Sequence, residues 1–207
     1  MEKFKRIGKI NLVLEKPEAT KMLPSKRAFE RGLMAEQNGW IKRAIKLHKQ
    51  AIKLDPNNTE ALEQLSNIFL DEERLEEAEE CCRKAVAINP LCPRLHRNLA
   101  FILHAQGCCS EAEQWYKKTL GLSPDYCEAR CNLAFMYEEL NQEAKALAEW
   151  ETIVNCLDGP IFLRATAEFE RKKILEKRKL AIVSRHVTPL RLKKRTNIGK
   201  KKLFLVS

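Results

Sequence analysis

The 207-residue chain has few of the residues that break regular structure, with 7 glycines and 8 prolines. An all-β fold rich in turns needs more of both, so the composition argues against that class. No apolar run approaches the about 18–20 residues that a membrane span needs. The N-terminus has lysines but no apolar run long enough for a secretory signal. We therefore expect a cytoplasmic protein with reduced thiols, and a nuclear location stays open if the host is eukaryotic.

Motifs that carry catalysis are also missing. There is no glycine-rich phosphate loop, no H-E-x-x-H and no nucleophile elbow. The 4 histidines, at positions 48, 96, 104 and 186, form no group with acidic residues that would mark acid–base chemistry. The sequence therefore predicts a non-enzymatic protein that needs no cofactor.

The 8 cysteines show no C-x-x-C pair, so the usual spacings of zinc ribbons and thioredoxin-like sites are absent. Two pairs at helical i, i+4 spacing leave a shared ligand open: Cys127 with Cys131, and His104 with Cys108. Cysteine is also a good small hydrophobe for crowded helix interfaces. We favour packing and predict no metal.

Three columns of residues recur every 34 positions in the middle of the chain. The alanine column is Ala44, Ala78, Ala112 and Ala146; the proline column is Pro56, Pro90 and Pro124, with Asp158 in the fourth place; the small column is Gly32, Ser66, Ala100 and Ala134. Apolar residues between these columns follow the helical period. Such regular spacing indicates one helical hairpin that is repeated along the chain.

The 34-residue period with these columns resembles the tetratricopeptide repeat family over about residues 25–158. The resemblance implies an all-α, right-handed superhelical solenoid of about four antiparallel helix hairpins. We expect a basic N-terminal extension at 1–24, repeats at 25–58, 59–92, 93–126 and 127–158, a capping helix at 159–184 and a basic, flexible tail at 185–207. Self-association of such repeats stays open.

The columns have a packing interpretation. A small residue in the first helix lets the second helix of the same hairpin come close, and the alanine column does the same between hairpins. Proline ends the second helix because it lacks an N–H and clashes with the preceding turn. In the first repeat, Arg31 and His48 stand where later repeats have large apolar residues, and we expect them to face solvent.

Two local patterns predict further details. Ser110 and Glu113 form a capping-box pattern, which predicts a helix start at this point. After the repeats, apolar residues at the start of the capping helix are expected to face inward: Ile161, Phe162, Ala165 and Phe169.

The resemblance also implies a site, because first helices of such repeats line a concave groove that receives a peptide or a helix. Mapping by period predicts groove residues in all four repeats: Phe29, Leu33, Gln64, Asn67, Asp71, Arg94, Arg97, Asn98, Phe101, His104, Cys131, Asn132, Phe135 and Glu138. We expect an apolar patch at one end, a basic centre and an acidic end. This pattern suits an amphipathic helix or a mixed-charge peptide.

Asn98 and Asn132 occupy the same place in successive repeats, each within an Asn-Leu-Ala triplet. An amide side chain can bond a peptide backbone without reading its sequence, and the pair resembles the asparagine ladder of some family members. Simple solvation of both amides is the alternative. A clamp for a C-terminal carboxylate is not expected, because Phe29 and Leu33 occupy its basic and amide positions.

The charge of the chain is uneven, although the total is +10. Residues 31–159 hold 15 basic and 21 acidic side chains, whereas residues 160–207 hold 15 and 3. The tail clusters are Arg191, Lys193, Lys194, Arg195, Lys200, Lys201 and Lys202. A nucleic-acid-associated factor that binds anions through this tail is the alternative to a protein-binding adaptor. An acidic protein, a membrane surface or no partner at all stay open for the tail.

Overall fold

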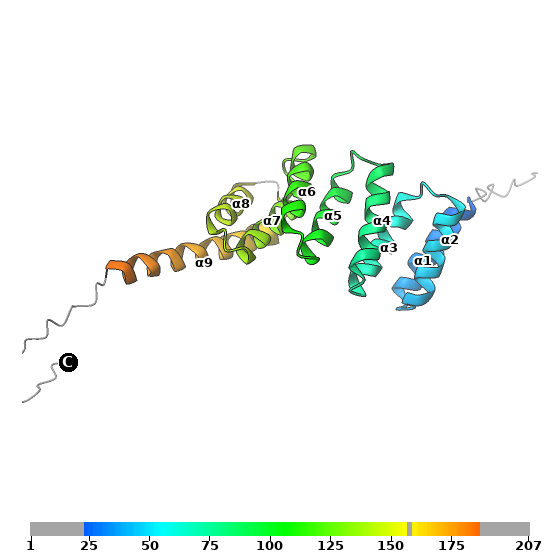
Figure 1. Ribbon diagram of the computed structural model, residues 1–207, viewed down its shortest axis with the longest axis horizontal. Helices are drawn as coiled ribbons and strands as arrows, with labels where there is room; N and C mark the ends of the chain where they lie inside the picture. The colour runs from blue at the N-terminus through cyan, green and yellow to red at the C-terminus, as the bar shows by residue number, and fades with distance from the viewer. Residues whose placement is uncertain (1–22, 157–158, 187–207) are drawn as a thin grey trace, which may run out of the picture.

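The computed structural model describes residues 23–156 and 159–186, with side chains up to residue 182. These residues form helices and no strand. The helices are α1 (Pro24–Gln37), α2 (Ile41–Leu54), α3 (Thr59–Asp71), α4 (Leu75–Ile88), α5 (Pro93–Ala105), α6 (Cys109–Leu122), α7 (Cys127–Glu139), α8 (Glu143–Asn155) and α9 (Ile161–His186). The expected all-α solenoid of helix hairpins is confirmed (Figure 1).

The helices stack in chain order along the longest axis of the molecule (Figure 1). The hairpins are α1–α2, α3–α4, α5–α6 and α7–α8, and the second helix of each packs on the first helix of the next. α9 packs on α8 and also touches α7. Contacts of α5 with α7, and of α7 with α9, place these three helices in one continuous layer.

The alanine and small columns form the interior of this stack. Every member of the alanine column is fully buried, which leaves no room for a larger side chain. Ser66, in the small column, donates a hydrogen bond from Oγ to the backbone carbonyl of Ala78 at 2.8 Å. This bond joins the two helices of the second hairpin and satisfies a buried hydroxyl.

The turn inside each hairpin uses the left-handed backbone region at one residue, and these residues again follow the repeat period. Gly39 and Gly107 have φ of 71° and 79°, and Glu73 and Asn141 have φ of 58° and 57°. Glycine and asparagine adopt this region readily, whereas glutamate carries a steric cost.

The predicted capping box is wrong. α6 begins at Cys109, its N-cap residue is Cys108, and no side chain caps it. The tight turn at Gly107 explains the start, because Cys108, the residue after this left-handed glycine, is already the N-cap. Equivalent N-cap residues stand at the same point of the period in the other hairpins: Trp40, Arg74 and Gln142.

The predicted inward face of α9 is also wrong. Ile161, Phe162 and Phe169 are 77%, 66% and 67% exposed, and Ala165 is exposed too. The buried side chains of α9 are Leu163, Ala167 and Ile174. Leu163 and Ala167 stand one repeat period after Ala129 and Leu133, which are buried on α7, so α9 packs in the register of a first helix.

His48 is a third correction, because its side chain is fully buried rather than facing solvent. The ring lies in the space beside Gly32 and contacts the ring of Phe29 at a centroid distance of 5.5 Å. Its Nε2 bonds to Glu36, at the end of α1. Arg31 is exposed, as expected.

Candidate functional site

Phenylalanines recur at one position of the first helices and remain partly open to solvent. Phe101 on α5, Phe135 on α7 and Phe169 on α9 are each one repeat period apart, and we call them the phenylalanine column. They are 42%, 38% and 67% exposed. The Phe135 ring packs edge-on against Trp150, with centroids 4.9 Å apart, and this contact holds its orientation. The column follows the layer in which α5, α7 and α9 touch.

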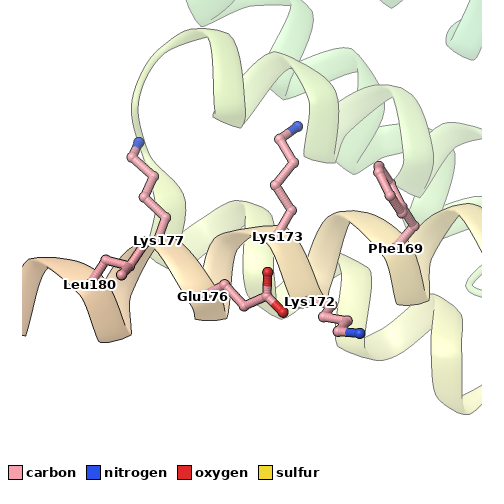
Figure 2. A pocket seen from close by; sticks show the side chains of 6 residues that line it. All are labelled: Phe169, Lys172, Lys173, Glu176, Lys177 and Leu180. Atoms are coloured by element: carbon pink, nitrogen blue, oxygen red, sulfur yellow. The ribbon is translucent and has the colours of Figure 1, made fainter.

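The last member of the column lies beside a hollow on α9 with a volume of about 520 Å³. The hollow is lined by Phe169, Lys172, Lys173, Glu176, Lys177 and Leu180. Figure 2 shows Phe169, Lys173 and Lys177 projecting from the same side of α9, toward the preceding helices. An aromatic ring and ammonium groups therefore share one open surface.

Ion pairs hold two of these lysines to neighbouring helices. Lys173 bonds to Glu170 at 2.5 Å and reaches Glu138 on α7 at 3.5 Å. Lys177 pairs with Glu143 at the start of α8. The hydrogen bond to Glu170 raises the pKa of Lys173 above its usual value. These exposed pairs add little stability but fix where the positive charges stand.

Asn98 already has a partner within the protein. Its amide donates to Oε1 of Glu63 at 3.0 Å, and Arg94 bonds to Oε2 of the same carboxylate at 2.7 Å. Glu63 is 6% exposed, so both bonds compensate for a buried negative charge. The guanidinium of Arg94, in the expected basic centre, is therefore neutralised by Glu63 on α3. One amide hydrogen of Asn98, in the expected asparagine ladder, is already engaged in a hydrogen bond within the protein.

The second ladder residue, Asn132, is half-buried beside the hydroxyl of Tyr116. Burial raises the pKa of Tyr116 well above its usual value. Arg97 is half-buried as well, and its guanidinium lies 5.8 Å from the centre of the Tyr126 ring. The buried Nε of Arg97 has no hydrogen-bond partner. Arg97 is thus partly committed to packing.

The expected acidic end is also tied into internal contacts. Glu138 accepts a hydrogen bond from Nε1 of the buried Trp150 at 2.7 Å. His104 bonds to Glu139 at 2.9 Å, from α5 to α7. Arg94, His104 and Glu138 of the predicted groove therefore already have partners within the protein.

The remaining predicted groove residues differ in how open they are. The half-buried ones are Phe29, Leu33, Gln64 and Asn67, whereas Asp71 is exposed. Cys131 is 7% exposed and offers almost no surface to a ligand. The structure thus leaves Phe101 and Phe135 as the open apolar members of the predicted set.

The mapping by period stopped at the fourth repeat and so missed the α9 part of this surface. Phe162, Phe169 and Lys172 each stand one repeat period after a first-helix residue of the fourth repeat. Continuing the same period by one step finds them. The apolar pattern of α9 predicted the wrong inward face, because both its buried and its exposed faces contain large hydrophobic residues.

The predicted anion-binding residues of the tail, Arg191 to Lys202, lie outside the described residues, as do residues 1–22. Within the described ranges, no group of three or more His, Cys, Asp or Glu side chains could hold a metal ion. No helix among the described residues is long and apolar enough to cross a membrane.

Comparison with known proteins agrees with the repeat geometry. The family model described as tetratricopeptide repeat matches residues 35–106. Residues 35–106 thus belong to the tetratricopeptide repeat family. The chain is 26% identical over 144 residues to TPR repeat-containing thioredoxin TTL4 of Arabidopsis thaliana, a match that covers 69% of this chain and 21% of that protein. It is 33% identical over 135 residues to tetratricopeptide repeat protein 17 of Danio rerio, with 64% and 11% covered. The chain spans only a small part of the length of these relatives.

Solved structures share the fold. A crystal structure of MamA superposes with a TM-score of 0.61 at 18% identity and covers 86% of this chain and 98% of that one. The first TPR of Spaghetti (RPAP3), bound to the HSP90 peptide SRMEEVD, gives a TM-score of 0.55 at 22% identity. That match covers 58% of this chain and 95% of the other.

Proposed function

We propose that this protein is a non-enzymatic interaction scaffold that binds a peptide or helix of another protein along the layer of α5, α7 and α9. The phenylalanine column carries the proposal. Three aromatic rings at one repeat position stay open to solvent, although burial of such rings is strongly favourable. Exposed apolar rows of this kind mark interaction surfaces.

The spacing of the column favours a particular partner. Helices in contact pack with their axes about 8–10 Å apart, so we expect rings at the same position of α5, α7 and α9 to lie a similar distance apart. An amphipathic helix with apolar residues at i and i+7 matches this separation, because seven residues rise about 10.5 Å. Such a helix could place one apolar side chain beside each ring.

Charge adds a second preference. α9 carries lysines close to Phe169, and Lys172 is exposed. A partner with acidic residues next to its apolar ones would complement this end of the surface. The similar structure of Spaghetti holds a peptide that contains two glutamates and an aspartate, SRMEEVD. That likeness supports peptide binding as a mode for this fold.

A displayed library of random peptides, selected on the full chain, tests the proposal. We expect enriched peptides to combine apolar residues at helical spacing with acidic residues. Phe169→Ala should weaken their binding about tenfold or more, which fluorescence polarisation measures. Leu91→Ala is the matched control, because Leu91 is similarly exposed but lies in the loop between α4 and α5. Equal binding by both variants would contradict the proposed site.

The alternative function, nucleic-acid association through the basic tail, rests on the charge of the C-terminal segment. Residues 160–207 hold 15 basic and 3 acidic side chains. Truncation after residue 184 should abolish retention on immobilised RNA or DNA at low salt while leaving peptide binding unchanged. Retention that survives the truncation would remove the tail from any nucleic-acid role.

A further inference from the structure

Two thiols meet where the fourth hairpin joins α9. Cys127 is the first residue of α7, and Cys156 is the residue that follows the end of α8. A Cβ atom placed on Gly159 would lie 3.0 Å from Sγ of Cys127 and 3.4 Å from Sγ of Cys156. Cys156 also contributes to the raised pKa of Cys127, which agrees with two neighbouring thiols. Both sulfurs therefore border the same small space.

This pair has a route to solvent. A cavity of about 340 Å³ is lined by both cysteines together with Asp125, Arg130 and Thr152. Cys127 is 2% exposed, whereas Cys156 is half-buried, so a small oxidant would reach Cys156 first. Burial raises the pKa of Cys127 to about 11, which keeps this residue in the thiol form at neutral pH.

The charged neighbour Arg130 has a defined place at this cavity. Its guanidinium donates to the Pro124 carbonyl at 2.9 Å and to Glu149 at 2.9 Å. These bonds tie the loop before α7 to α8, so the walls that carry the two cysteines are already held together. A covalent link between the sulfurs would then need no large movement of the helices.

We propose that Cys127 and Cys156 are a redox-modification site that forms a reversible disulfide. With a peroxide as oxidant, the Cys156 thiolate attacks one peroxide oxygen and becomes a sulfenic acid, and the other oxygen leaves as water or an alcohol. The Cys127 sulfur then attacks the Cys156 sulfur, and the sulfenic oxygen departs as water with the Cys127 proton. A thiol reductant reverses the link by exchange.

The link would act on α9. Gly159 packs against both sulfurs, and α9 begins two residues later at Ile161. A bond between the sulfurs joins the start of α7 to the end of α8 beside this junction. It therefore limits how α9 can move relative to α7 and α8. The device is independent of what binds to the phenylalanine column.

Peptide mapping of the full chain tests the site. The reduced protein is treated with hydrogen peroxide, free thiols are alkylated, and the protein is digested with trypsin without reduction. We expect a linked pair of peptides, 119–130 with 146–164, which a reductant separates. Cleavage after Arg130 keeps Cys131 out of this product, so the assignment is unambiguous.

Matched variants decide the outcome. Cys156→Ser, at the half-buried position, should abolish the linked pair, and Cys92→Ser, also half-buried, should leave its yield within about twofold of the wild type. Hydrogen exchange over residues 161–174 should slow severalfold in the oxidised wild type and stay unchanged in Cys156→Ser. The proposal is overturned if Cys156 oxidises without this link, or if it links equally to other cysteines.

Discussion

The ring of His48 fills the space that a side chain at Gly32 would need. A Cβ atom on Gly32 would lie only 2.7 Å from Nδ1 of His48, which is closer than real side chains allow. Nε2 of the same ring bonds to Glu36, and Nδ1 is buried without a partner. Gly32 of the small column and the ring of His48 are thus the two sides of one contact between α1 and α2.

Gly32→Ala should destabilise the protein by about 1–3 kcal/mol, because the added methyl group must displace a fully buried ring. Urea unfolding followed by circular dichroism measures the change. Gly121→Ala is the control: Gly121 lies in α6 and a Cβ there meets nothing within 4 Å. That substitution should be neutral or stabilise by up to about 1 kcal/mol. Equal effects of both substitutions would contradict the contact.

Ala112→Leu should cost about 1–3 kcal/mol, since Ala112 is fully buried between hairpins and the extra atoms overpack the stack. Thermal unfolding of the full chain gives the comparison. Ala87→Leu, on the exposed face of α4, adds the same atoms outside the core and should leave the midpoint nearly unchanged. An unchanged midpoint for Ala112→Leu would count against a close-packed alanine column.

Glu73→Gly should raise stability by about 1 kcal/mol. Glu73 adopts a φ of 58°, a region that costs an L-residue with a Cβ about 1–2 kcal/mol and costs glycine little. Glu72→Gly is the control, because its φ of −85° is ordinary and glycine gains nothing there. Differential scanning calorimetry of the two variants distinguishes them, and a loss of stability in Glu73→Gly would contradict the strained turn.

Asn98→Ala should lower stability by about 1–2 kcal/mol, because it leaves the buried Glu63 carboxylate with one partner fewer. Asn67→Ala is a fair comparison, since Asn67 is half-buried on the neighbouring first helix. Urea unfolding of the two variants measures the change in the free energy of unfolding for each. An unchanged free energy of unfolding in Asn98→Ala would contradict this internal role of the amide.

Much of the fold could be predicted from the sequence because it depends on repetition. The repeat period places a buried alanine, a small residue and a left-handed turn residue at equivalent points of each hairpin. A repeat that packs on copies of itself must have complementary surfaces. Residues in one column therefore make equivalent contacts in each hairpin. The same repeat period also predicted part of the candidate site, namely Phe101 and Phe135.

Pairing between helices could not be predicted in this way. The asparagine at position 98 is an apparent peptide ligand by its column, yet Glu63 on α3 accepts its hydrogen bond. The histidine at position 48 is polar, yet the gap above Gly32 accommodates its ring. In each case the partner belongs to another helix, and the distance between the two side chains is decided only when the helices pack.

By itself, the sequence determined that this chain folds into stacked helical hairpins, because local periodicity and the recurring columns require the same small residues at each contact. Only the tertiary structure decided which face of α9 is buried, since both of its faces are apolar and contact with α7 and α8 selects Leu163, Ala167 and Ile174. That selection exposes Phe169 and extends the phenylalanine column, and the same stacking brings the thiols of Cys127 and Cys156 together.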